Sequence, residues 1–253
     1  MAHRTLTAEL KPHERIILPW DRSTISDPER LLLEKIARHV GMFKVGYQAF
    51  TATNHDTTVG FEVGMMAREL DIGVFQDWKF KDIQNTVKSA VANIAADSVT
   101  PTRIITIHAT MRAATIEAAV LAAGDKSLIA GVTLLTDHDE DDADYIYHTT
   151  SGSVVTQSAD TLEMVAEKTG RSIGIVCAPK ELELLEDSRL VRITPGIRDK
   201  DAPLDDQNRD RTMTAAEAIA AGADYLVIGR PILNAADPVA AAQKFAAEIA
   251  SAL

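Results

Sequence analysis

The segment IGVFQDWKFKDIQNT, residues 72–86, joins a short apolar run to a cluster of four charged side chains. The run at residues 72–75 is typical of a buried β-strand, and Asp77 and Lys79 follow at its end. Residues two apart on a strand point to the same face, so these two side chains are predicted to lie side by side. Asp82 follows in the loop or at the start of the next helix.

A lysine placed between carboxylates suits acid–base chemistry. Such an array is costly to assemble in a partly buried place, and the neighbouring carboxylates favour the ammonium form of the lysine. Lys79 is therefore a candidate acid that delivers a proton to a carbon or oxygen atom. Two other interpretations stay open. The charge cluster could be ordinary solvated surface, and Asp82 could simply be the N-cap of a helix that begins at Ile83.

The same unit, an apolar run followed by a helical pattern, recurs along all 253 residues. Strands are predicted at residues 16–20, 42–46, 72–75, 103–108, 128–135, 172–177, 190–194 and 225–228. Helices are predicted at residues 27–39, 57–70, 82–96, 111–123, 161–170, 179–185, 215–222 and 238–252. The runs do not alternate with polar residues, as expected of parallel strands buried on both faces. The pattern predicts an α/β protein with one (β/α)₈ TIM barrel, a single domain over residues 1–253.

Composition excludes several classes of function. The net charge of −11, from 26 basic and 37 acidic residues, argues against nucleic acid or an anionic membrane as the main partner. The single cysteine, Cys177, cannot form an intrachain disulfide and is expected to be a buried thiol. The first residues lack the apolar core of a signal peptide, and no run reaches the roughly 18 apolar residues of a membrane span. We therefore expect a soluble cytoplasmic protein.

Polar residues collect where the predicted strands end, which is where the active site of such a barrel lies. Phosphate commonly binds to the loops after strands seven and eight, and both loops here pair a glycine with an arginine. The glycines would let backbone N–H groups approach an anion, and arginine grips phosphate through two hydrogen bonds. The glycines could instead only serve tight turns, and the arginines could lie on the surface. The residues at the strand ends are Asp21, Lys44, Asp77, Lys79, Thr136, Gly196, Arg198, Gly229 and Arg230.

The pattern Asp-x-Lys-x-x-Asp-Ile-x-Asn-Thr at residues 77–86 resembles the active-site signature of the orotidine 5'-phosphate decarboxylase family. A wider suprafamily of sugar-phosphate decarboxylases and synthases shares only the Asp-x-Lys-x-x-Asp part. Lys81 stands where His is usual in the family, and Gln84 stands where Pro is usual. The resemblance continues in KVG at 44–46, LT at 135–136, TPGIR at 194–198, DQ at 206–207 and VIGRPI at 227–232. The first strand, LPWD at 18–21, departs most from the family pattern.

The resemblance implies a carboxy-lyase that needs no cofactor or metal and converts orotidine 5'-phosphate to UMP in pyrimidine biosynthesis. Lys79 would protonate C6, Asp77 would face the substrate carboxylate, and Lys44 and Asp82 would complete the charged network. The family also implies a homodimer with shared active sites, in which Asp82 reaches the site of the partner. The implied substrate-binding residues are Asp21, Thr86, Thr136, Arg198, Gln207, Gly229 and Arg230. The polar segment at residues 199–212 is expected to be a lid over the ligand.

Two alternatives remain at this point. A metal-dependent decarboxylase or aldolase of the same suprafamily would act on a sugar phosphate and need a Mg²⁺ site with oxygen ligands. A barrel that binds a nucleotide without catalysis would need none of the charged array. Turnover of orotidine 5'-phosphate discriminates between all three interpretations.

Overall fold

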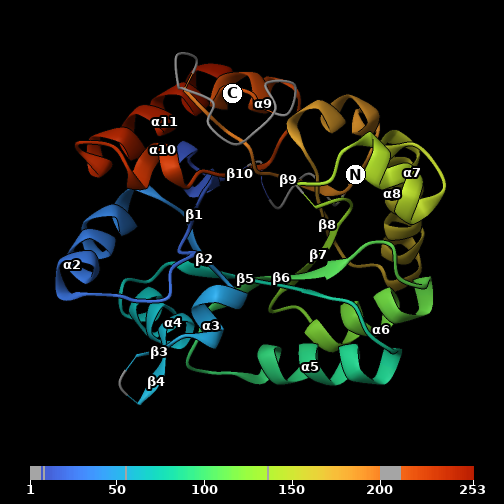
Figure 1. Cartoon of the computed structure of the whole chain (residues 1–253), viewed down its shortest axis with the longest axis horizontal. Helices are drawn as coiled ribbons and strands as arrows, with labels where there is room; N and C mark the ends of the chain where they lie inside the picture. Colours follow the sequence, from blue (N-terminus) through green and yellow to red (C-terminus); the bar gives the residue numbers. More distant parts are fainter. Residues whose placement is uncertain (1–6, 8, 55, 136, 200–211) are drawn as a thin grey trace.

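A closed barrel of eight parallel strands forms the centre of the molecule, with the helices around it (Figure 1). The computed structural model describes residues 7, 9–54, 56–135, 137–199 and 212–253. The predicted eight-stranded parallel barrel is therefore confirmed, with the strand order β1-β10-β9-β8-β7-β6-β5-β2 around the ring. The strands are β1 (Ile16–Pro19), β2 (Met42–Gly46), β5 (Gly73–Phe80), β6 (Thr102–His108), β7 (Leu128–Val132), β8 (Ile173–Val176), β9 (Val191–Thr194) and β10 (Tyr225–Val227).

Local sequence signals begin many of the helices. Ser26 precedes the helix that begins at Asp27, and its backbone N–H and hydroxyl both donate to Glu29 in a capping box, with Pro28 in the first turn. At the last helix the N-cap side chain is the acceptor instead, since Asp237 Oδ1 accepts from the backbone N–H of Ala240 at 3.0 Å. The α-helices are α2 (Asp27–Ile36), α3 (Tyr47–Thr51), α4 (Val59–Glu69), α5 (Gln84–Ala96), α6 (Ala113–Ala123), α7 (Glu140–Tyr147), α8 (Ser151–Thr169), α9 (Ala215–Ala220), α10 (Arg230–Leu233) and α11 (Pro238–Ala252). The shorter elements are the 3₁₀ helices η1 (Pro12–Arg15), η2 (Ala37–His39) and η3 (Pro179–Leu185), and the hairpin of β3 (Thr53–Asn54) and β4 (Thr57–Thr58).

The strands are buried on both faces. One set of side chains points into the barrel and packs as a small apolar cluster, and the alternate set packs against the surrounding helices in a much larger one. This double burial explains the continuous apolar runs in the sequence. The inward cluster consists of Ile17, Met42, Phe75, Ile104, Ala130 and Ile193.

Cys177 follows β8 and is buried, as expected from the apolar run before it. Burial raises the pKa of its thiol to about 12, with the Glu181 carboxylate adding to the effect. The side chain is therefore an uncharged thiol at neutral pH and packs as a small apolar group.

Among the described residues, no helix is long and apolar enough to cross a membrane.

Several predicted boundaries differ from the structure. β5 continues to Phe80, so Asp77 and Lys79 lie inside the strand rather than after it. β7 ends at Val132, and the backbone N–H and hydroxyl of the next residue, Thr133, both donate to the carbonyl of Val176. The sequence patterns did not predict α3, the β3–β4 hairpin or α10, which are too short to show a periodicity. The long segment at 199–212 and its lid function lie almost wholly outside the described residues.

We predict that Gly41→Ala lowers the free energy of unfolding by about 1–3 kcal/mol, because a Cβ there would overlap the backbone carbonyl of Glu14. Gly152→Ala is the matched control, since its Cβ would only make an ordinary contact in α8. That control should gain about 0.5–1 kcal/mol from removing a helical glycine. Urea unfolding of both variants measures the difference, and equal stabilities would contradict the assigned overlap.

Candidate active site

The inward face of three adjacent strands carries polar side chains one layer above the apolar floor of the barrel. Met42 of β2 and Phe75 of β5 belong to that floor, and Lys44 and Asp77 stand two residues further along the same strands. Because side chains alternate along a strand, both charged groups point into the barrel mouth. The register brings the strands together, with Lys44 opposite Phe75 and Gly46 opposite Asp77.

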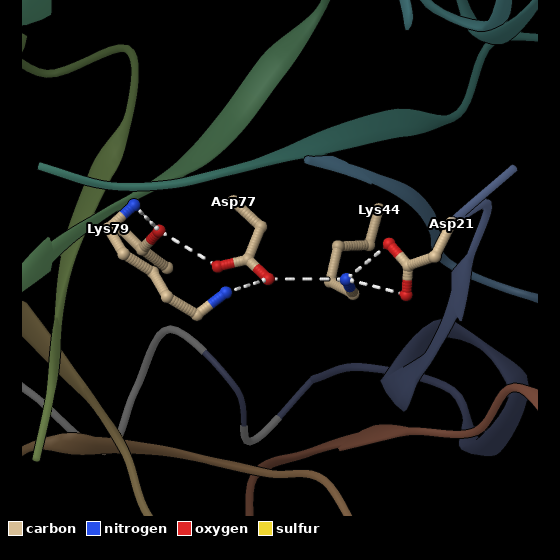
Figure 2. A network of polar contacts seen from close by, with 5 residues as sticks. Asp21, Lys44, Asp77 and Lys79 are labelled. Atoms are coloured by element: carbon tan, nitrogen blue, oxygen red, sulfur yellow. Dashed lines mark hydrogen bonds and ion pairs between the residues drawn. The ribbon is translucent and has the colours of Figure 1, made fainter. Parts of the chain in front are cut away.

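Four charged side chains form a continuous row at this level (Figure 2). The Nζ of Lys44 donates to both carboxylate oxygens of Asp21, at 2.9 and 3.1 Å, and to Oδ2 of Asp77 at 3.2 Å. The Nζ of Lys79 donates to the same Oδ2 of Asp77 at 2.7 Å. Two ammonium groups therefore share one carboxylate oxygen, and the sequence-based pairing of Asp77 with Lys79 is present in the folded chain.

An irregular turn of the backbone places Lys79. Its φ of 47° lies in the left-handed region, which is uncommon for a residue with a side chain. The register of β5 against β6 shifts between Gln76 and Phe80, as expected at a bulge. The Thr106 hydroxyl holds this turn, because it accepts from the backbone N–H of Lys79 at 2.8 Å and donates to Oδ1 of Asp77 at 2.9 Å. Backbone strain of this kind is often found at functional sites.

Burial and pairing act in opposite directions on the inner two charges. Burial alone would raise the pKa of Asp77, but the ammonium groups of Lys44 and Lys79 and the hydrogen bonds from Lys79 and Thr106 outweigh it and lower that pKa. Burial alone would lower the pKa of Lys44, but the carboxylates of Asp77 and Asp21 outweigh it and raise that pKa. Both inner groups are therefore charged across the neutral range.

The outer two charges remain accessible to a ligand. The side chains of Asp77 and Lys44 are only 10% and 11% exposed, whereas those of Lys79 and Asp21 are 29% and 53% exposed. The arrangement can thus present an ammonium donor and a carboxylate to a bound molecule while the buried pair fixes their positions.

The beginning of α5 lies apart from this row. Asp82, Ile83 and Thr86 are all exposed, and among the described residues Asp82 forms no hydrogen bond or ion pair with Lys79 or Asp77. Asp82 does not cap the helix either. Its carboxylate accepts from the N–H of the adjacent Ile83 at 2.6 Å, and Ile83 is itself the N-cap of a helix that begins at Gln84.

The loops after β9 and β10 hold the residues predicted to bind phosphate. Gly196 has a φ of 83°, so the glycine there serves a turn that other residues rarely adopt. Gly229 lies against β1, where a Cβ would come within 2.8 Å of Pro19 Cγ. Arg198 is half-buried and donates from Nη1 to the carbonyl of Ile197 at 2.8 Å, and Arg230 is the exposed first residue of α10. Thr136 and Gln207 lie outside the described residues.

Sequence patterns missed two polar residues of β6. Thr106 joins the row through the hydroxyl described above, and His108 follows two residues later at the end of the strand. The available signal was their spacing from Ile104, since the inward face of β6 carries residues 104, 106 and 108. Both residues interrupt an apolar run. Polar residues within such a run are therefore candidate site residues, like the polar residues that follow it.

Comparisons with known proteins agree with the motif. A family model described as Orotidine 5'-phosphate decarboxylase / HUMPS family matches residues 14–245. A protein of Geobacter metallireducens named orotidine 5'-phosphate decarboxylase is 38% identical over 227 residues, covering 85% of this chain and 88% of its own. One of the same name from Rhodopseudomonas palustris strain BisB5 is 36% identical over 250 residues, covering 97% and 98%.

The fold has solved counterparts as well. The crystal structure of orotidine 5'-phosphate decarboxylase from Lactobacillus acidophilus matches with a TM-score of 0.71 at 23% identity. The match covers 92% of this chain and 98% of that one. At this identity the likeness concerns the barrel fold alone.

We predict that Thr106→Val weakens the fold at neutral pH and reduces the stability that the fold loses in acid. The folded-state pKa of Asp77 lies below its ordinary value, so its stabilisation is present above about pH 4 and is lost as pH falls through the folded pKa. Removing the hydroxyl raises that pKa towards its ordinary value, so the variant should lose less stability than wild type as pH falls below about 4. At neutral pH the variant should lose about 1–3 kcal/mol, since Lys79 N–H and Asp77 each lose a partner.

Urea unfolding as a function of pH measures this effect. Thr161→Val is the matched control, because its hydroxyl donates only to the carbonyl of Gln157 in its own helix. An unchanged pH dependence in Thr106→Val would contradict the assigned hydrogen bond to Asp77.

Proposed function

The chain belongs to the orotidine 5'-phosphate decarboxylase family, and from that membership we propose the roles of its site residues in converting orotidine 5'-phosphate to UMP. The protein is a carboxy-lyase of pyrimidine biosynthesis, in line with the names of relatives that cover almost the whole chain. The observation that supports the residue roles best is the row Asp21–Lys44–Asp77–Lys79 at the mouth of the barrel.

The reaction removes CO₂ from C6 and leaves a carbanion that must be protonated. We assign Asp77 to the substrate carboxylate, because its lowered pKa keeps it anionic and two like charges would then repel each other in the ground state. The departure of CO₂ relieves that repulsion. Lys79 offsets the developing negative charge at C6 and then donates its proton there, so its interaction is stronger in the transition state than in the ground state.

Lys44 and Thr106 keep this pair in position. The Lys44 ammonium holds Oδ2 of Asp77 from the side opposite Lys79, and the Thr106 hydroxyl holds Oδ1. With three donors on one carboxylate, Asp77 cannot turn away from the reacting atoms without leaving a buried charge unpaired. A group preorganised in this way loses little free energy to reorientation during the reaction.

The remaining groups of the substrate, its ribose and its phosphate, are assigned to residues outside the Asp77–Lys79 pair. Asp21, whose carboxylate is half exposed, suits the ribose hydroxyls as a hydrogen-bond acceptor. Arg198, Gly229 and Arg230 lie in the loops after β9 and β10, where barrels of this kind bind phosphate. We keep Thr136 and Gln207 as proposed contacts to the pyrimidine and the phosphate, and Thr86 as a proposed contact from the start of α5.

A homodimer with shared sites accounts for the exposed beginning of α5. Ile83 is 71% exposed and Tyr47 of α3 is 55% exposed, both close in sequence to site residues. A second copy of the chain placed over the start of α5 would bury the exposed Ile83 side chain and bring its own Asp82 and Thr86 to the site. We also propose a cytoplasmic location, where pyrimidine biosynthesis would take place.

The metal-dependent alternative receives no support from the comparisons, since the relatives carry the decarboxylase name over most of the chain. Among the residues that the structure describes, no group of three or more His, Cys, Asp or Glu side chains is placed to hold a metal ion.

We expect Lys79→Ala to abolish turnover of orotidine 5'-phosphate in an ultraviolet absorbance assay. Proton transfer by a positioned acid contributes about 10²–10⁴-fold, and the electrostatic stabilisation of the carbanion is lost as well. Lys35→Ala, which removes an exposed charge from α2, is the matched control and should be as active as wild type. Near-normal activity in Lys79→Ala would refute the assigned mechanism.

Mixing inactive Lys79→Ala with inactive Asp82→Ala subunits should restore activity if the sites are shared. Half of the dimers in an equal mixture are hybrids with one intact site of two, so recovery should approach about a quarter of the wild-type rate. Subunit exchange is verified separately with two differently tagged chains. No recovery despite complete exchange would contradict the role of Asp82 across the interface.

A further inference from the structure

His108 occupies the layer directly above Thr106 on the inward face of β6. Ile104 belongs to the apolar floor and Thr106 contacts Asp77, so the next inward side chain, two residues further, stands at the level of a bound substrate. The imidazole is partly buried there. It lies at the reacting end of the site, because its neighbour along the strand touches the same carboxylate that holds Lys79.

The Nδ1 atom of His108 is buried and has no hydrogen-bond partner in the described part of the chain. Thr110, just beyond the strand, has a buried hydroxyl in the same condition. Nearly all buried polar atoms in proteins are paired, so two unpaired atoms at one strand end point to a partner supplied by a ligand or water. Neither residue has a part in the row of charges described above.

The groups facing His108 keep its imidazole uncharged near neutral pH. Burial lowers its pKa, as do the ammonium groups of Lys81 and Lys79 and the imidazole of His138, and only the carboxylate of Asp77 opposes them. Lys81 comes from the loop after β5 and lies 6.0 Å from the centre of the Tyr147 ring. The neutral ring carries one N–H donor and one acceptor nitrogen.

We propose that His108 is a substrate-contacting residue whose uncharged imidazole donates from Nδ1 to the C6 carboxylate of the nucleotide and orients it for the loss of CO₂. This inference rests on the proposed roles of Asp77 and Lys79. A neutral donor fits the chemistry, because a charged imidazolium would bind the carboxylate about twice as strongly. Binding gained in the ground state alone slows the chemical step, since it must be given up when CO₂ leaves.

The pH dependence of substrate binding should differ from the pH dependence of UMP binding. As pH falls through the lowered pKa of His108, an increasing fraction of its imidazole is charged, so KM for orotidine 5'-phosphate and kcat should fall together. UMP has no carboxylate at C6, so its inhibition constant should not share that fall. Both nucleotides carry a phosphate whose second pKa is about 6, and the ratio of KM to the UMP inhibition constant cancels its titration.

Three variants test the residue itself. His108→Leu should lower kcat/KM for orotidine 5'-phosphate by about 10–100-fold, the loss of one hydrogen bond to a charged group, with UMP inhibition unchanged. His108→Asn keeps a donor near the position of Nδ1 and cannot become charged, so it should retain more activity and lose the decrease of the KM ratio at low pH. His148→Asn is the matched control, because His148 is exposed and has a φ of 55°, which asparagine tolerates.

The outcomes separate this inference from the function itself. If wild type fails to turn over orotidine 5'-phosphate, the proposed function is wrong. If wild type is active and both His108 variants keep its kcat, KM and pH dependence, only the role of His108 is wrong. An equal loss of substrate turnover and UMP binding in His108→Leu would overturn the carboxylate contact, because it would show a general support of the site. Should His108→Leu fail to fold, the pH dependence of wild type and His108→Asn decides the question.

Discussion

The carboxylate of Asp77 lies in the polar layer of the barrel, almost out of contact with water, and three donors hold it there. A buried charge of this kind is stable only when it is fully paired, and removing one partner typically costs about 3–5 kcal/mol. Lys44 satisfies it from one neighbouring strand and Thr106 from the other, while Lys79 reaches it from the same strand. The arrangement of the whole site follows from satisfying this one group.

The fold supplies what the buried carboxylate requires. Closed pairing of eight parallel strands leaves no edge that could shift, so the inward positions of β2, β5 and β6 keep their heights relative to one another. The left-handed backbone conformation of Lys79 is unfavourable, and the Thr106 hydroxyl stabilises it by accepting a hydrogen bond from the Lys79 backbone N–H. The ammonium group of Lys79 is thereby kept against Asp77, while 29% of the lysine side chain remains exposed.

The inner and outer parts of the site therefore differ in character. The inner part is a set of saturated contacts within one chain, and its charges are maintained by opposing shifts in the pKa values of Asp77 and Lys44. The outer part is incomplete, because His108 has a buried nitrogen without a hydrogen-bond partner among the described residues and the start of α5 presents Asp82 and Ile83 to solvent. A nucleotide and a second copy of the chain are the partners that we propose for these groups.

The sequence by itself determined the barrel and the composition of the charged segment at residues 77–82. Apolar runs, capping residues and prolines act over a few neighbouring residues, so they predicted all eight strands and located α11 at its observed ends. Asp77 and Lys79 could be paired from the sequence because they are two residues apart. Only the tertiary structure decided that β5 continues through them, that Asp82 caps no helix, and that the Thr106 hydroxyl bonds to Asp77. These features depend on the register between strands whose residues are far apart in the chain, and no local periodicity carries that information.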